Sequence, residues 1–139
     1  DVNLGMAVDT PRGLMVPTIY GADKLSIQQI SAAAKSLAAE CQKGTISPDL
    51  IRNGTFTVTN LGGLGVESFT PVINPPQTCI LGVNTITTAV KDVGGKAVPY
   101  QSMALSLTFD HRALDGAPAA RFLKDVKETL ENFSLLLIE

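Results

Sequence analysis

The decisive stretch of this chain is residues 103–116, which read MALSLTFDHRALDG. Apolar and polar side chains alternate up to Phe109, as in a half-buried β-strand. A pattern typical of a helix begins near Ala117, so a strand and a helix are expected to meet at a corner. That corner carries His111, the only histidine of the chain, and Asp115 lies four residues after it.

A histidine at such a corner is a candidate general base, because the unperturbed pKa of an imidazole lies close to neutrality. A lone histidine is more often an ordinary core or surface residue, but the flanking residues favour the functional interpretation here. We expect His111 to project into a cleft. Asp115 either caps the final helix, where the helix dipole favours a carboxylate, or pairs with an arginine and orders the loop.

Composition restricts the class of protein. The 139 residues are enough for one domain, and 45% apolar residues can build a sizeable core. A net charge of −2 with scattered Lys and Arg argues against nucleic-acid binding. No apolar stretch approaches the roughly 20 residues that span a bilayer, and a metal site has too few soft ligands. Cys41 and Cys79 are expected to be buried, free thiols in a reducing compartment.

Periodicity predicts an α/β chain, or α+β with a mostly β middle. Strands are expected at residues 4–9, 13–19, 55–59, 78–86 and 97–109, with tight turns at residues 9–13 and 93–96. Helices are expected at residues 27–43 and 117–132, with a short helical turn at 48–53. A Ser26–Gln29 capping box opens the first helix and Gly44 ends it. The final helix places Ala120, Leu123, Val126 and Leu130 on one face.

Two further segments give weaker indications of function. The glycines of residues 62–65 could indicate phosphate binding, but no Gly-x-Gly-x-x-Gly pattern and no following Lys-Ser/Thr accompany them. A loop held close by packing is the favoured interpretation. The apolar tail at residues 133–138 is expected to dock either on the domain or on a partner.

Residues 109–116 resemble the active-site signature of the dihydrolipoyl acyltransferases, the core components of the 2-oxo acid dehydrogenase complexes. His-x-x-x-Asp-Gly alone is shared with chloramphenicol acetyltransferase and other CoA-dependent acyltransferases. Here it stands with segments that resemble the family's early hairpin and its central strands, in the right order: residues 5–17, 54–62, 73–77 and 80–82. The resemblance therefore covers essentially the whole chain.

The resemblance implies a chloramphenicol-acetyltransferase-like two-layer sandwich, in which helices pack on a mixed β-sheet. It also implies a homotrimer, built into a larger core, with active sites between subunits. The implied reaction is that of a dihydrolipoyllysine-residue acyltransferase, which moves an acyl group between dihydrolipoamide and coenzyme A. His111 is the implied general base for the thiol, Asp115 orders its loop, and Thr59 supplies an oxyanion-stabilising hydroxyl across the interface. Coenzyme A is a substrate, and no metal is required.

The family's catalytic domain is longer than this chain. Residues 1–139 are therefore expected to be its C-terminal part, without the N-terminal portion, the lipoyl domain or the peripheral-subunit-binding domain. The 2-oxo acid decarboxylase and dihydrolipoyl dehydrogenase would bind through those absent domains, one of which carries the lipoyl group. Bacterial cytoplasm is the expected compartment, with the mitochondrial matrix as the alternative. The absent portion is also expected to carry substrate-channel residues and the arginine that holds the Asp115 carboxylate. The arginines present in this chain are not assigned that role: Arg12, Arg52, Arg112 and Arg121.

Two hypotheses follow from the resemblance. The first is a working acyltransferase domain that uses His111 and Thr59. The second is a structural assembly module, which keeps the trimer-forming surfaces without turnover and whose apolar tail docks between trimers. The intact His111-to-Asp115 pattern favours the first. Acetyl, succinyl and branched-chain enzymes share these motifs, so the acyl group stays open.

Overall fold

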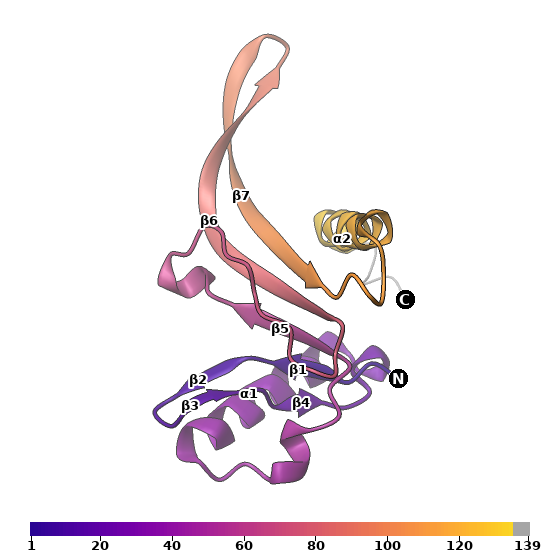
Figure 1. Cartoon of the computed structure of the whole chain (residues 1–139). Coiled ribbons are helices and arrows are strands. Elements are labelled where there is room, and N and C mark those ends of the chain that lie inside the picture. The colour runs from indigo at the N-terminus through magenta and orange to yellow at the C-terminus, as the bar shows by residue number, and fades with distance from the viewer. Residues whose placement is uncertain (135–139) are drawn as a thin grey trace.

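The computed structural model describes residues 1–134. These residues form a mixed five-stranded sheet with helices, and a separate two-stranded hairpin (Figure 1). The strands are β1 (Leu4–Met6), β2 (Val8–Thr10), β3 (Gly13–Met15), β4 (Thr18–Ile19), β5 (Phe56–Asn60), β6 (Cys79–Val93) and β7 (Lys96–Phe109). The α-helices are α1 (Ile27–Lys43) and α2 (Gly116–Glu131). Short 3-10 helices are η1 (Ala22–Lys24), η2 (Pro48–Ile51) and η3 (Gly62–Leu64). Most of the apolar tail lies outside the described residues, so its docking stays a prediction.

The main sheet has the strand order β4-β1-β5-β6-β7. β1, β5 and β6 run parallel, whereas β4 pairs antiparallel with β1, and β7 pairs antiparallel with β6. The two predicted N-terminal strands are each divided. Their outer parts, β1 and β4, join the main sheet, and their inner parts, β2 and β3, form the small hairpin. The predicted turn at residues 9–13 is therefore confirmed, but the strands beside it change sheets.

Helix α1 has the predicted bounds because its ends carry strong capping signals. The Ser26 hydroxyl accepts the Gln29 N–H at 3.2 Å, and the Gln29 side chain accepts the Ser26 N–H at 2.8 Å. Gly44 ends the helix in the left-handed region, at φ 71°. Leu37 of this helix joins Ile19 and Ala22 in a buried apolar cluster, so α1 packs on the N-terminal strands.

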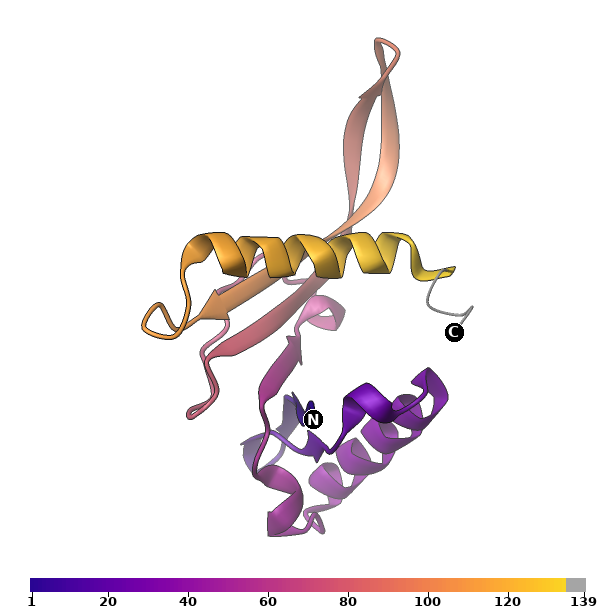
Figure 2. The same cartoon turned by 90° about the vertical axis from the view of Figure 1, so that its right-hand side faces the viewer.

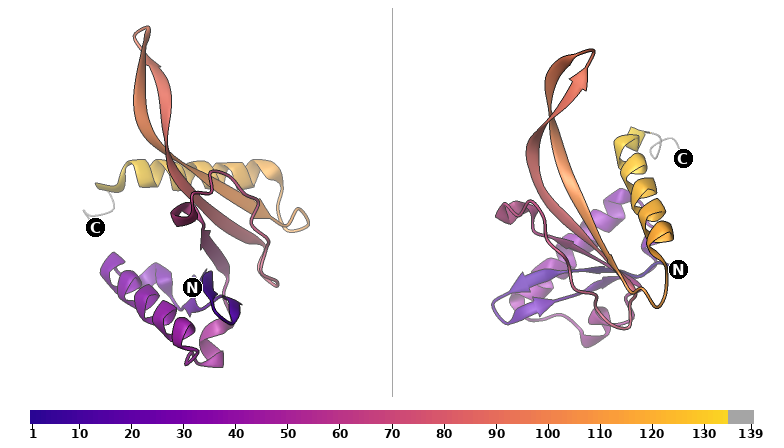
Figure 3. Two further views of the ribbon diagram at one scale, coloured as in Figure 1. Left: turned by 90° about the vertical axis from the view of Figure 1, so that its left-hand side faces the viewer. Right: turned by 45° about the horizontal axis from the view of Figure 1, so that its top comes forward.

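The β6–β7 hairpin is much longer than the predicted strand at residues 78–86. Its turn is the predicted one, with Gly94 and Gly95 at positive φ of 59° and 80°. Beyond Ile86 the outer half projects past both helices (Figures 1 and 3). Apolar side chains there are exposed, with Ile86 at 65% and Val90 at 64%. Residues 87–93 mix Thr, Lys and Asp with apolar residues, so they lack the buried pattern that predicts an inner strand.

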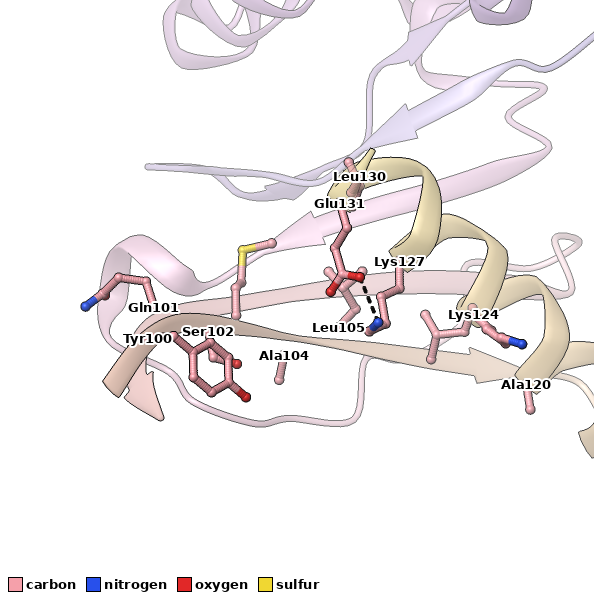
Figure 4. Close-up of a pocket in the computed structure, with 12 residues that line it drawn as sticks. Tyr100, Gln101, Ser102, Ala104, Leu105, Ala120, Lys124, Lys127, Leu130 and Glu131 are labelled. Carbon is pink, nitrogen blue, oxygen red and sulfur yellow. Dashed lines mark hydrogen bonds and ion pairs between the residues drawn. The ribbon is translucent and has the colours of Figure 1, made fainter. Parts of the chain in front are cut away.

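Helix α2 crosses the strands between the projecting β6–β7 hairpin and the N-terminal part of the molecule that contains α1 (Figure 2). The Phe122 ring meets the Phe56 ring of β5 edge to face, with centroids 5.9 Å apart. Ala120, Leu123 and Leu130, three members of the predicted apolar face, line a groove of about 730 Å³ against β7. Figure 4 shows this groove between the helix and residues 100–105.

The two cysteines are unpaired, and their burial differs. Cys41 is only 1% exposed, and this burial raises the pKa of its thiol. Cys79 is half-buried, so the prediction of two buried thiols is correct for Cys41 only. Within residues 1–134, no helix is long and apolar enough to cross a membrane. The same residues contain no group of three or more His, Cys, Asp or Glu side chains placed to hold a metal ion.

Candidate active site

The predicted corner around His111 lies between the end of β7 and the start of α2. Asp110 closes it with backbone hydrogen bonds on both sides. Its N–H donates to the Thr78 carbonyl at 2.8 Å, and its carbonyl accepts the N–H groups of Ala113 and Leu114 at 2.9 and 3.2 Å. The corner is therefore a hydrogen-bonded turn that presents His111 at its tip.

The His111 imidazole is held by neighbours from its own segment. Its ring lies 5.6 Å from the Phe109 ring, tilted by 43°, and its Nδ1 lies 3.6 Å from Asp115 Oδ1. The His111 and Asp115 side chains are 72% and 84% exposed. The groove between β7 and α2 is lined by residues other than His111 and Thr59. The expectation that His111 projects into a cleft is therefore wrong for the single chain.

Asp115 occupies the N-cap position of α2, but its side chain accepts no hydrogen bond from the helix. The expectation of a side-chain helix cap is therefore wrong, and the carboxylate faces His111 instead. Arg112 is not its partner, because that guanidinium pairs with Asp110 at 2.7 Å. Hydrogen bonds from Arg112 lower the pKa of the Asp110 carboxyl to about 2. Among the described residues, the ion pairs of Asp115 include no arginine.

Thr59 lies near the end of β5, and the sheet register places it beside Gly82 and Ser106. Side chains alternate along a strand, so Thr59 points to the same face as Thr57 and to the opposite face from Phe56. Thr57 is 1% exposed and hydrogen-bonds the Gln77 side chain at 2.6 Å. Thr59 itself is half-buried, and its face of the sheet is the one without α2.

One chain does not bring Thr59 and His111 together. Strand rise of ~3.3 Å per residue and strand spacing of ~4.8 Å put the Thr59 Cα about 14 Å from the Phe109 Cα. Ser106 is in register with Thr59, and Phe109 lies three residues further along β7, so the Phe109 side chain points to the opposite face. That face is the one with α2, since Phe109 Cζ would lie 4.0 Å from a Cβ added at Gly116. His111 lies two residues after Phe109, and its ring is beside the Phe109 ring at a tilt of 43°. A contact between the hydroxyl and the imidazole therefore requires two copies of the chain.

The glycine-rich segment is a packing feature, as favoured from the sequence. An added Cβ at Gly62 would lie 2.6 Å from the Asn84 carbonyl oxygen, so the backbone passes close to β6. Asn84 is 2% exposed, and its amide donates to the Ala104 carbonyl at 2.9 Å. This amide bridges the point where the β6–β7 register shifts. Sequence reasoning missed Asn84, because a polar residue in a strand gives no local sign of being buried.

The fold and the corner together define a class of protein, the catalytic cores of 2-oxo acid dehydrogenase complexes. The chain resembles the Azotobacter vinelandii dihydrolipoamide acetyltransferase with a TM-score of 0.93 and 38% identity, over 98% of this chain and 56% of that one. A truncated catalytic core of the 2-oxoacid dehydrogenase multienzyme complex from Thermoplasma acidophilum gives a TM-score of 0.83 and 40% identity, over 94% and 57%. These neighbours confirm the predicted chloramphenicol-acetyltransferase-like fold.

The sequence comparison identifies the family. Residues 1–138 match the model of the 2-oxoacid dehydrogenases acyltransferase (catalytic domain), and the chain belongs to that family. The pyruvate dehydrogenase acetyltransferase component of Acholeplasma laidlawii is 47% identical over 99% of the chain and 25% of that protein. The dihydrolipoyllysine-residue succinyltransferase component of the mitochondrial 2-oxoglutarate dehydrogenase complex 1 of Arabidopsis thaliana is 42% identical over 99% of the chain and 30% of that protein. The chain thus spans about a quarter to a third of these relatives.

Proposed function

We propose that this chain contributes an acyltransferase centre that moves an acyl group between dihydrolipoamide and coenzyme A. The main support is spacing. In the Azotobacter vinelandii enzyme, a serine, a histidine and an asparagine have been investigated for their role in the catalytic mechanism. Thr59, His111 and Asp115 have the same separations along this chain. Threonine keeps the hydroxyl of serine, and aspartate keeps an acceptor oxygen beside the histidine, although it replaces the amide donor of asparagine with a negative charge.

His111 acts as general base through Nε2 in this proposal. An Nδ1–H directed at Asp115 leaves the Nε2 lone pair available for the thiol proton. The deprotonated sulfur of one substrate attacks the thioester carbonyl carbon of the other, forming a C–S bond. Collapse of the tetrahedral intermediate breaks the original C–S bond, and His111 returns the proton to the departing thiolate. Such proton transfer contributes about 10²–10⁴ in rate.

Thr59 stabilises the oxyanion of that intermediate. Its hydroxyl donates a hydrogen bond to the oxygen that gains charge, and a donor of this kind is worth about 10²–10³ in rate. Because Thr59 and His111 lie on opposite faces of one chain, each centre combines His111 of one copy with Thr59 of the next. Asp115 lies beside His111 and orients it, without touching the substrate.

The two-copy centre supports the proposal of a cyclic homotrimer built into a larger core. A structure with a TM-score of 0.93 is the cubic core of a pyruvate dehydrogenase multienzyme complex. We infer the same kind of assembly here, with residues 1–139 forming the C-terminal part of a catalytic domain. The lipoyl group, the 2-oxo acid decarboxylase and the dihydrolipoyl dehydrogenase are reached through other domains of the complex. Two unpaired cysteines suit a reducing compartment such as the bacterial cytoplasm.

A structural assembly module is the second candidate function. It is favoured by the exposed apolar side chains of the projecting β6–β7 hairpin, Ile86 at 65% and Val90 at 64%, which suit contacts between copies. Its surfaces would then serve assembly while transfer is absent.

Acetyl transfer from acetyl-CoA to dihydrolipoamide separates the two functions. The purified chain is assayed beside its His111→Ala variant, and oligomer size is measured for both. Transfer that is lost in the variant, with unchanged size, supports the acyltransferase centre. Equal transfer by both proteins contradicts the role of His111. Assembly without transfer in either protein contradicts the acyltransferase proposal for this chain and supports the structural module.

A further inference from the structure

Asp110 makes further contacts within the His111 corner, through its side chain, in addition to its three backbone hydrogen bonds. Its carboxylate Oδ1 accepts the backbone N–H of Arg112 at 2.9 Å and the Arg112 Nε–H at 3.0 Å. Its Oδ2 accepts the Arg112 Nη2–H at 2.7 Å. The carboxylate therefore closes a short side-chain-to-backbone turn across His111, which is the geometry that makes aspartate common in turns.

The two Arg112 groups that bind this carboxylate, the guanidinium and the backbone N–H, differ in exposure and in position. The Arg112 side chain is 91% exposed, whereas the Asp110 side chain is 23% exposed. Exposed ion pairs are screened by water and contribute little. The N–H of Arg112, in contrast, fixes the peptide that directly follows His111, so its position determines where the imidazole can point.

No hydrogen bond is formed by the imidazole itself among residues 1–134. The Phe109 ring lies beside it, and Asp115 Oδ1 lies 3.6 Å from Nδ1. The other charged side chains of the turn, Asp110 and Arg112, pair with each other. An exposed ring with these few contacts takes its orientation from the backbone on either side. A wrong orientation would turn Nε2 away from its partner, and displacement by about 1 Å can cost about 100-fold in rate.

We propose that Asp110 is a positioning residue, which holds His111 with Nδ1 toward Asp115 and Nε2 outward by accepting the backbone N–H of Arg112. This inference deepens the proposed function and rests on His111 being the base. It assigns Asp110 no contact with either substrate. Its effect is transmitted through the turn, so removing the acceptor oxygen should matter more than removing the guanidinium.

The single histidine makes the test direct. In ¹⁵N-histidine-labelled protein every imidazole signal belongs to His111, and the ring-nitrogen shifts report which nitrogen carries the proton. Four variants separate the contacts: Asp110→Ala removes both, Asp110→Asn keeps an acceptor oxygen, Arg112→Ala keeps the backbone N–H, and Asp125→Ala on exposed α2 is the control. We expect Asp110→Ala to move the ring shifts toward those of an unconstrained imidazole. Asp110→Asn and Arg112→Ala should move them little, and the control not at all.

Unchanged ring shifts in Asp110→Ala would overturn the inference, and so would an equally large change in Arg112→Ala. Transfer assays add a second readout, in which Asp110→Ala lowers kcat about 10- to 100-fold with little change in KM. In a His111→Ala background the same substitution should have no further effect. If His111→Ala abolishes transfer while Asp110→Ala changes nothing, the positioning role alone fails. If His111→Ala keeps its transfer rate, the proposed base fails, whatever the ring shifts show.

Discussion

His111 and Thr59 are held by the same chain in opposite ways. His111 lies at an exposed corner whose hydrogen bonds and ring contact come almost entirely from residues 109–115. Thr59 lies in the sheet, half-buried, with neighbours from β6 and β7 that are distant in sequence. The two residues also point to opposite faces. Each half of the proposed centre is therefore organised within one chain, but the centre is completed only where two copies meet.

The largest effect is expected from His111→Ala, which should lower the transfer rate by about 10²–10⁴-fold because the general base is lost. The exposed side chain makes no buried contact, so the free energy of unfolding should change by less than about 0.5 kcal/mol. Transfer kinetics and denaturant unfolding measure the two quantities. A stable variant with full activity would show that the His111 corner takes no part in the transfer reaction.

Thr59→Val should lower transfer by about 10²–10³-fold, because the hydroxyl that stabilises the oxyanion is removed. Thr59→Ser is the matched control, since it keeps the hydroxyl, and it should retain most of the rate. Both are compared by kcat with saturating acetyl-CoA. Equal losses in the two variants would show that Thr59 acts through packing rather than through its hydroxyl.

Gly82→Ala tests whether the two faces are independent. The added Cβ would lie 2.8 Å from Phe69 Cζ, beside Thr59. The clash should destabilise the fold by about 1 kcal/mol, at the lower end for overpacking because the ring can shift. Transfer should fall, while the His111 ring shifts stay unchanged. Gly63→Ala is the control, because nothing lies within 4 Å of the added atom. Altered His111 shifts in Gly82→Ala would mean that the faces are coupled.

The smallest effect concerns pH. The pKa of Asp110 is lowered to about 2 by hydrogen bonds from Arg112. A lowered pKa means that the carboxylate stabilises the fold above its unfolded pKa of about 3.9, and that this contribution is lost as the pH falls toward 2. The side-chain carboxyl ¹³C resonance of Asp110 should therefore titrate with a midpoint near 2, well below the ordinary carboxyl value. A titration midpoint of the Asp110 carboxyl at its ordinary value of about 3.9 would contradict the hydrogen bonds from Arg112.

The parts of the molecule that could be predicted from the sequence are those defined by residues adjacent in the chain. Helix α1 follows from Ser26, Gln29 and Gly44, all adjacent to the element they define. The His111 corner follows equally from a local pattern. Thr59 is ordinary by propensity, because a threonine in a strand needs no function, and only the family resemblance singled it out.

Other features could not be read from neighbouring residues. The length of β6 depends on pairing with β7, which holds a chain segment of mixed polarity extended. The expected cleft at His111 fails in one chain, because the residue that would face it lies on the other side of the sheet. Asp110 was overlooked, although its carboxylate and the N–H two residues later form a recognisable turn pattern.

The most direct test of the central claim mixes two inactive variants, His111→Ala and Thr59→Val, by co-expression in one assembly. Each variant supplies the group that the other lacks. In a cyclic oligomer whose centres pair His111 of one copy with Thr59 of the next, random mixing should rebuild about a quarter of the centres. We therefore predict about a quarter of the unmodified activity. Mixed assemblies that stay inactive would contradict the account, because both residues would then have to act from the same chain.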